Sequence, residues 1–281
     1  MGVKDDLMNL INNDMQAEVN TENNDYVNDK DGLIYCGICN SPKEKIVELF
    51  GETKKVYVAC TCRQKEIDEE RKEHEEYQRR IRLNMLRDAT FDDSVLHNQT
   101  FEKADNTLEH KNFAMKYVEH FDEMEKENIG LLFSGDIGTG KTFLAASIAN
   151  ALVEKGVTVK MTNFSRILND MTNLQIDKNK YIKSQNEKRL LIIDDFGIQR
   201  DTSFATEHIF NIIDSRYRTN KPVIFTTNYS VQYLMNAENL KEKRIYSRVL
   251  EMATPMMFTG ENFRLKIMKD KAKKANLLLN L

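Results

Sequence analysis

The sequence predicts an α/β fold: a mainly parallel sheet covered on both faces by helices, preceded by a small cysteine-bearing module. The first observation is that short apolar stretches alternate with longer stretches at helical spacing from residue 129 onward. The second is a glycine-rich turn between the first strand and its helix, and the third is a cluster of all four cysteines between residues 36 and 62. Strands that alternate with helices pair in parallel, because each helix carries the chain back across the sheet.

Apolar and β-branched residues predict five strands, which are residues 129–133, 157–162, 189–195, 221–228 and 255–258. Helical periodicity predicts the helices, which are residues 143–152, 204–218, 239–250 and 261–278. An amphipathic helix is predicted upstream of the sheet, at residues 112–125. Its buried side is predicted to carry Phe113, Tyr117, Val118 and Phe121.

Composition limits the class of protein. The chain has 281 residues, of which 41% are hydrophobic and 30% charged, enough for one core domain and an appendage. The net charge of −3 excludes a global basic field, although a local basic surface remains possible. No apolar run approaches the ~20 residues that span a bilayer, and residues 1–7 lack the apolar stretch of a signal peptide. We expect a cytoplasmic protein with no membrane partner.

The glycine-rich turn matches the phosphate-loop pattern G-x-x-x-x-G-K-[ST]. Its residues are Gly135, Asp136, Ile137, Gly138, Thr139, Gly140, Lys141 and Thr142. Glycines let successive backbone N–H groups point inward, and the following helix adds the positive end of its dipole, so an anion binds there. Lys141 can reach the β- and γ-phosphates, and Thr142 can ligate Mg²⁺. The alternative is a glycine turn without a ligand, which the strand and helix on either side disfavour.

Polar residues end two of the other predicted strands. Asp194 and Asp195 follow four apolar residues, and Asp194 is predicted to hold Mg²⁺ at the end of its strand. Asp195 is expected to orient or deprotonate an attacking water, and Asn228 to contact the γ-phosphate or that water. The alternatives are a strand ending at a polar turn and an asparagine cap.

Cys36, Cys39, Cys60 and Cys62 are predicted to surround one structural Zn²⁺. Alternating apolar residues between the two cysteine pairs predict a hairpin around Gly51 that brings the pairs together. Four protein ligands leave no position for a catalytic water. Disulfide bonds are the alternative, which a reducing cytosol disfavours.

The predicted organisation has four parts. They are a flexible segment at residues 1–31, a zinc-ribbon-like module at 32–62, a charged helical linker at 63–94 and the main domain at 95–281. A short helix at residues 7–11 that docks on a partner is the alternative for the first part. Within residues 163–189, basic residues lie near Phe164 and Tyr181, which predicts either a single-stranded nucleic-acid contact or a solvated face.

These motifs resemble the AAA+ group of P-loop ATPases, and more narrowly the DnaC/DnaI-type replicative helicase loaders and their IstB-like relatives. The features are Gly135–Thr142, Leu190–Asp195 followed by Phe196 and Gly197, the stretch Phe225–Asn228, and the helix with Arg244 and Arg248. The resemblance covers roughly residues 95–270, and the cysteine module is similar to the zinc-binding helicase-docking domain of the DnaI-type branch.

The resemblance implies roles for these residues. Lys141 and Thr142 match the Walker A positions, Asp194 and Asp195 the Walker B positions, and Asn228 the sensor 1 position. Arg248 matches the arginine finger that acts on ATP in an adjacent subunit, and Arg264 matches the sensor 2 arginine. Many members carry Glu where Asp195 stands, so slow, switch-like hydrolysis is expected. The chain after Phe258 is too short for the usual helical lid, as in the loader branch.

The function implied is ATP-dependent loading of a replicative helicase onto single-stranded DNA, with ATP/ADP, Mg²⁺ and Zn²⁺ bound. ATP binding would drive assembly and hydrolysis would drive release. The expected partners are a hexameric replicative helicase, single-stranded DNA and further copies of the chain at the ATP sites. The alternatives are an IstB-like ATPase that regulates transposition, and a nucleotide-dependent binding module without hydrolysis.

Overall fold

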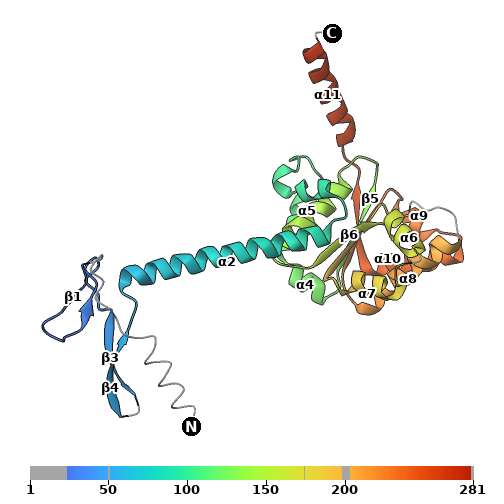
Figure 1. The fold of residues 1–281 in the computed structure, drawn as a ribbon. Helices are drawn as coiled ribbons and strands as arrows, with labels where there is room; N and C mark the ends of the chain where they lie inside the picture. Colours follow the sequence, from blue (N-terminus) through green and yellow to red (C-terminus); the bar gives the residue numbers. More distant parts are fainter. Residues whose placement is uncertain (1–23, 50, 174, 198–202, 280–281) are drawn as a thin grey trace. The chain divides into compact units, whose positions relative to one another are not determined.

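The computed structural model describes residues 24–49, 51–173, 175–197 and 203–279 (Figure 1). The chain divides into two compact units, residues 1–80 and 81–281. The boundary falls inside the long helix α2 (Thr61–Thr90). The predicted helix at residues 7–11, and most of the predicted flexible segment 1–31, lie outside the described residues.

The first unit contains two small antiparallel sheets. Strands β1 (Tyr26–Val27) and β2 (Ile34–Tyr35) form one, and β3 (Glu44–Leu49) and β4 (Glu52–Tyr57) form the predicted hairpin. Gly51 adopts a φ of +85° at its turn, a region that glycine enters without steric cost. Asp25 accepts hydrogen bonds from the Lys43 ammonium and the Gly37 N–H, which ties β1 to the loop around the first cysteines.

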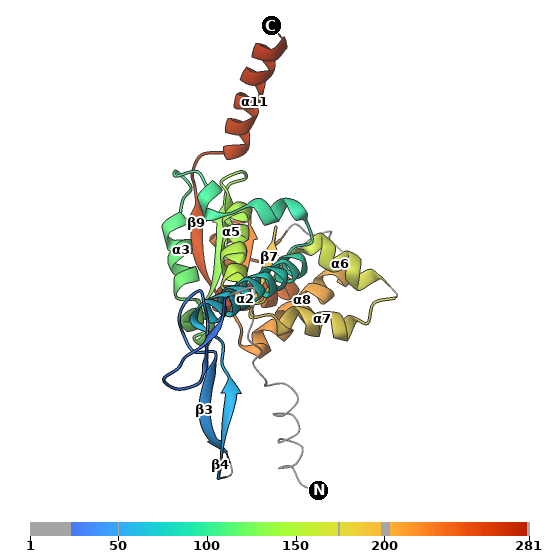
Figure 2. The same ribbon diagram turned by 60° about the vertical axis from the view of Figure 1, so that its left-hand side comes forward.

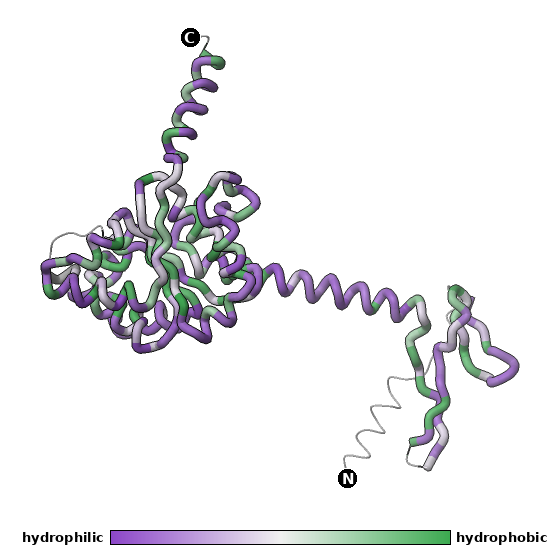
Figure 3. The backbone as a smooth tube through the Cα atoms, turned by 180° about the vertical axis from the view of Figure 1, so that it is seen from behind, coloured by the Kyte–Doolittle hydropathy of each residue, from purple (hydrophilic) through white to green (hydrophobic). Residues whose placement is uncertain are grey.

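Helix α2 is charged and exposed over nearly all of its length, as Figure 3 shows by its hydrophilic colouring. Ion pairs at helical spacing support it, namely Arg63–Glu66, Asp68–Arg71 and Arg71–Glu75. Downstream, the predicted loop contains two short 3₁₀ helices, η2 (Ser94–Asn98) and η3 (Phe101–Lys103). Phe91 forms a parallel bridge with Met161, so the chain enters the second unit along the edge of its sheet.

The second unit is built on the predicted five-stranded parallel sheet, in the order β6-β7-β8-β5-β9. The strands are β5 (Gly130–Gly135), β6 (Val159–Asn163), β7 (Leu190–Asp194), β8 (Val223–Thr227) and β9 (Ala253–Phe258). Pro255 lies in β9, an edge strand, where a missing N–H costs the sheet least. The chain leaves β5 for the far edge at β6 and returns to the other side at β9, so the carboxyl end of β5 lies at a switch point, where ligands of such sheets bind.

Alternation along the strands creates two cores. Leu131 and Phe133 of β5 belong to one hydrophobic cluster, and Leu132 to the other. The first cluster contains residues of α3 (Lys111–Glu119), α4 (Phe121–Lys126) and α5 (Lys141–Glu154). The second contains residues of α6 (Phe164–Thr172), α8 (Ser203–Thr219), α9 (Val231–Met235) and α10 (Leu240–Met252). Helices therefore cover both faces of the sheet (Figure 2).

Two further helices complete the unit. Helix α7 (Lys178–Glu187) packs beside α8, and α11 (Phe263–Leu279) is the single described helix after β9. No residue of α11 is buried. Among the described residues, no helix has both the length and the apolar character needed to cross a bilayer.

The predicted helix at residues 112–125 is wrong in two respects, its continuity and the burial of Phe113. Two helices, α3 and α4, meet at His120, whose φ of −100° and ψ of 27° depart from helical values. Phe113 is 46% exposed, because the buried stripe is centred on Ala114, Tyr117 and Val118 and leaves Phe113 at its margin.

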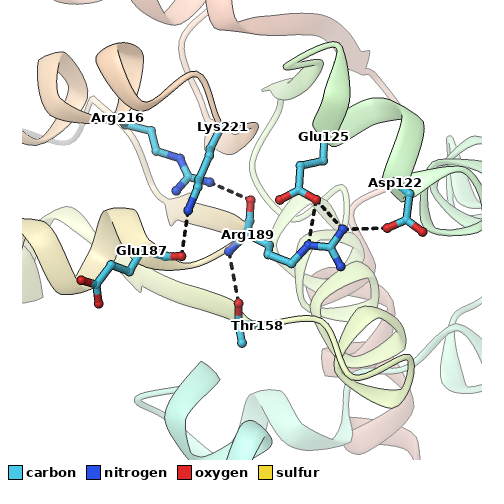
Figure 4. A network of polar contacts seen from close by, with 7 residues as sticks. All are labelled: Asp122, Glu125, Thr158, Glu187, Arg189, Arg216 and Lys221. Atoms are coloured by element: carbon cyan, nitrogen blue, oxygen red, sulfur yellow. Dashed lines mark hydrogen bonds and ion pairs between the residues drawn. The ribbon is translucent and has the colours of Figure 1, made fainter.

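Arg216 of α8 is a buried cation, 1% exposed, at the amino ends of β7 and β8. Its guanidinium donates to the carbonyls of Lys188 (2.9 Å), Arg189 (3.0 Å), Asn186 and Pro222. Figure 4 shows the bond to Arg189, with Lys221 binding Glu187 nearby. Burial lowers the pKa of Arg216 to about 10, so the group stays charged near neutral pH. The Arg216 guanidinium (the Arg216 fork) therefore fixes the amino ends of β7 and β8, and the carboxyl ends of these strands carry the predicted site residues.

Arg216→Met should lower the free energy of unfolding by about 3 kcal/mol or more, because several buried carbonyls lose their donor at once. Chemical denaturation measures the change. Lys221→Ala is the matched control, since Lys221 donates to the Glu187 carbonyl at 2.9 Å from a more exposed position. It should cost less than about 1 kcal/mol, and an equal loss in both variants would contradict the assigned role of Arg216.

Candidate nucleotide and metal sites

The phosphate loop runs from the end of β5 into α5. Gly135 has a φ of +140°, and a Cβ atom there would lie 2.0 Å from the Phe258 carbonyl oxygen of β9. Gly140 has a φ of +91° directly before α5 begins at Lys141. Glycine is required at both places, because a side chain would collide with β9 at the first and be strained at the second.

Lys141 folds back over this loop. Its ammonium donates to the carbonyls of Gly135 (2.8 Å) and Asp136 (2.6 Å), and the residue is only 7% exposed. Burial lowers the pKa of Lys141, and the negative charges of Asp195, Asp136 and Asp194 oppose that shift. A cation thus lies among inward-curving backbone at a helix N-terminus, which is an arrangement that binds phosphate.

Thr142 and Asp194 meet across the carboxyl edge of the sheet. The Thr142 hydroxyl donates to Asp194 Oδ1 at 2.9 Å, although the residues lie 52 positions apart. Burial raises the pKa of Asp194, and hydrogen bonds from Thr226 and Thr142 oppose that rise. Hydroxyl and carboxylate oxygens are suitable ligands for a hard divalent cation, so this pair fits Mg²⁺.

Asp195 follows Asp194 directly, and Asn228 follows the neighbouring strand β8. Asp195 is exposed and has a φ of +52°, and its charge acts on Lys141. Asn228 is exposed and directly follows β8, the strand between β7 and β5. The structure therefore places both predicted residues at the edge of the sheet that carries the phosphate loop.

The two predicted arginines differ in position. Arg264 lies in the first turn of α11, near enough for its charge to lower the pKa of Lys141, and the adjacent Phe263 N–H donates to the Gly138 carbonyl at 2.9 Å. Arg248 instead makes an ion pair with Asp214 of α8 at 2.5 Å, and its guanidinium lies 4.7 Å from the ring centre of Phe210.

A cavity of about 320 Å³ borders the phosphate loop at Gly140. Its apolar lining comes from Leu108, Phe143, Phe263 and Ile267, and its charged lining includes Lys103, Asp105, Lys266 and Asp270. Sequence reasoning missed this cavity because its walls come from three segments that are far apart in the chain.

The four cysteines of the first unit form one cluster. Their sulfur atoms all lie within 4.8 Å of one another, and all four are free thiols rather than disulfides. Tetrahedral zinc–thiolate bonds of about 2.3 Å separate neighbouring sulfurs by about 3.8 Å, so the cluster fits Zn²⁺. Hydrogen bonds from Ser41 and Thr61 lower the pKa of Cys39 to about 4, whereas hydrogen bonds with the neighbouring thiols raise the pKa of Cys62.

The predicted basic and aromatic surface at residues 163–189 is partly wrong. Phe164 is buried in the second core cluster, so it is not available for stacking on a base. Arg189 makes ion pairs with Asp122 and Glu125 (Figure 4). Its guanidinium also lies 5.3 Å from the ring centre of Phe121. The lysines of α7 are exposed, which agrees with both alternatives, a nucleic-acid contact and a solvated face.

The fold and these residues define an AAA+ type P-loop nucleotide-binding protein. The family model described as IstB-like ATP binding protein matches residues 63–272. Because that match covers more than half of the chain, the protein belongs to the IstB-like ATP-binding family.

Curated relatives come from both branches that the motifs suggested. The chain is 29% identical over 147 residues to the replicative helicase loader DnaI of Bacillus subtilis, a match covering 48% of this chain and 47% of that protein. It is 28% identical over 160 residues to the replicative helicase loader DnaC of Escherichia coli, covering 55% and 62%. It is 24% identical over 138 residues to a protein assigned as ATP-binding in an insertion sequence of Mycobacterium tuberculosis, covering 48% and 55%. The chain thus spans about half to three-fifths of the length of these relatives.

Solved structures agree on the fold. A crystal structure of DnaI matches with a TM-score of 0.52 at 23% identity, covering 62% of this chain and 94% of that one. A crystal structure of the DnaC helicase loader matches with a TM-score of 0.52 at 26% identity, covering 59% and 100%.

The purified protein should contain one zinc per chain, and Cys62→Ser should lose it, because three thiolates bind zinc more weakly than four. Nucleotide binding should survive in Cys62→Ser, since the cluster and the phosphate loop belong to different units. Elemental analysis and nucleotide titration measure the two properties. Thr53→Ala, at an exposed position of β4, keeps all four thiols and the Ser41 hydrogen bond, and it serves as the control. Full zinc content in Cys62→Ser would contradict the assignment.

Proposed function

We propose that this protein is an ATPase that loads a replicative DNA helicase onto single-stranded DNA. The observation that carries the proposal is the combination of two features in one chain. A four-thiol cluster lies in the first unit, and the second unit carries a candidate nucleotide site on a sheet like those of DnaC and DnaI. The nucleotide site would supply a switch, and the cysteine unit would supply a separate surface for gripping the helicase.

In this proposal ATP binds along the carboxyl edge of the sheet. The phosphate loop and Lys141 hold the phosphates, and the base and ribose enter the cavity beside Gly140. Thr142 and Asp194 hold Mg²⁺, which would neutralise charge on the phosphates. Asp195 orients the attacking water, and its side chain, shorter than Glu, agrees with slow hydrolysis.

Self-association follows from the role proposed for Arg248. An arginine finger must reach ATP in an adjacent subunit, whereas Arg248 here pairs with Asp214 of its own chain. ATP-dependent assembly would exchange that intrachain partner for the neighbour's γ-phosphate. Arg264, close to Lys141, would act on ATP in its own subunit.

The second candidate is an ATP-dependent regulator of transposition. It is supported by the family model and by the insertion-sequence relative. Such a regulator would act on duplex DNA and would not need a helicase. A third candidate, a binding module without hydrolysis, would bind ATP and release no phosphate.

The purified chain should load the hexameric replicative helicase of its host cell onto circular single-stranded DNA in the presence of ATP. Unwinding of an oligonucleotide annealed to the circle measures loading. Lys141→Ala should abolish loading and weaken ATP binding at least about tenfold, because the phosphates lose their ammonium partner. Lys155→Ala, at the other end of α5, is the control. ATP-dependent binding of duplex DNA without helicase binding would favour the transposition candidate instead.

Arg248→Ala should keep ATP binding and lower DNA-stimulated ATP hydrolysis by about 10³-fold or more, the range known for arginine fingers. Arg218→Ala is a matched control, because Arg218 also pairs with Asp214 (2.9 Å) but is mostly exposed on α8. Phosphate release and nucleotide titration are the measurements. Equal losses in both variants would assign the effect to Asp214 and its surroundings, and refute a finger at Arg248.

A further inference from the structure

Thr226 in β8 connects the two acidic residues at the end of β7. Its side chain is buried, at 1% exposed. The hydroxyl donates to Asp194 Oδ1 at 2.6 Å, and the same oxygen accepts the backbone N–H of Asp195 at 3.0 Å. The Thr226 carbonyl also accepts the Phe196 N–H at 2.7 Å. A single residue thus binds three consecutive residues of the acidic turn.

Chemistry fixes the direction of these bonds. A backbone N–H can only donate, so the Thr226 oxygen must accept from Asp195. The single hydroxyl hydrogen is then directed to Asp194, whose ionised carboxylate can only accept. Neither bond can reverse while Asp194 is ionised, so the hydroxyl holds the carboxylate in one orientation.

The bond to Asp195 has a separate consequence. Asp195 has a φ of +52°, which is uncommon for a residue with a Cβ atom and persists where neighbouring contacts impose it. The Thr226 hydroxyl is one such contact. The direction in which the Asp195 side chain leaves the backbone depends on this φ.

Thr226 differs from the other hydroxyl that touches Asp194. Thr142 also donates to Oδ1, but its oxygen is a candidate ligand of Mg²⁺ and would be drawn to the metal. Thr226 is buried, and its hydroxyl oxygen is already bound to Asp194 and to the Asp195 N–H, so it is not a candidate ligand of the metal.

We propose that Thr226 is a positioning residue that aligns Asp194 for magnesium and Asp195 for the attacking water. This inference rests on the nucleotide site proposed above. Thr226 touches neither ATP nor the metal and acts only through the two aspartates.

A buried threonine in this sheet does not need such bonds. Thr162 of β6 is 5% exposed, and its hydroxyl is buried without a hydrogen-bond partner in the described structure. Its strand, β6, borders β7 on the side opposite β8. Thr162→Val therefore removes an equally buried hydroxyl that is not bound to the acidic turn, and it is the matched control.

The test compares Thr226→Val, Thr226→Ser and Thr162→Val in the full chain. Valine keeps the shape and removes the hydroxyl, while serine keeps the hydroxyl. A fluorescent ATP analogue is titrated at a series of Mg²⁺ concentrations. Losing a residue that orients a metal ligand costs about 10- to 100-fold in metal affinity, so Thr226→Val should raise the half-saturating Mg²⁺ concentration by at least tenfold.

Four further results are expected. Nucleotide affinity without Mg²⁺ should be unchanged in Thr226→Val, which also shows that the variant is folded. At saturating Mg²⁺ its kcat should fall while KM for ATP stays within about threefold, because the displaced Asp195 acts on the water. Thr226→Ser should restore the Mg²⁺ dependence to within about threefold of the parent, and Thr162→Val should match the parent. If Thr226→Val does not fold, Thr226→Cys, whose thiol is a far weaker donor, carries the same prediction.

A parental Mg²⁺ dependence in Thr226→Val would overturn the inference, as would equal losses in the serine variant or in Thr162→Val. Failure of the proposed function gives a different result. If the parent protein shows no Mg²⁺-dependent ATP binding, the nucleotide site itself is wrong and the inference fails with it. If the parent does show it and Thr226→Val is unaffected, only the role of Thr226 is wrong.

Discussion

The hydrogen bond between Thr142 and Asp194 is the contact on which the site depends. It exists because β5, β8 and β7 are neighbours and parallel, so that their carboxyl ends share one edge of the sheet. The phosphate loop follows the first of these strands and the acidic turn follows the third. An antiparallel arrangement would place one of the two at the opposite edge, and no change of side chain would then bring their oxygens together.

This constraint explains why polar groups are distributed as they are along β7 and β8. The interior of both strands is apolar and fully buried, while each end has its own polar arrangement. At the amino ends, the Arg216 fork binds the last carbonyls before each strand. At the carboxyl ends, Thr226 binds the acidic turn. Both strands are therefore fixed at their two ends, which limits sliding of one strand against the other and so preserves the spacing of the site.

The start of α11 extends the site toward the C-terminal part of the chain. Phe263 binds the phosphate loop through its N–H, and a Cβ atom on Gly138 would lie 2.2 Å from the Asn262 side chain. Lys266 pairs with Asp105 one turn later. The first turn of α11 thus touches the loop that would hold the phosphates, whereas its later turns are exposed. In the proposed ATP site, these contacts of α11 would border the bound phosphates.

The sequence by itself determined the features that local patterns encode. Strand and helix periodicity gave the five parallel strands, and the phosphate loop, Asp194 and the clustered cysteines were recognisable because each motif is contiguous or closely spaced. Only the tertiary structure decided which side chains are shared between distant segments. It broke the helix at His120, buried Phe164, and paired Arg189 with α4 and Arg248 with Asp214. It also gave Thr226 its two aspartate partners, since hydrogen bonding between strands depends on strand order and register, which no local pattern of residues specifies.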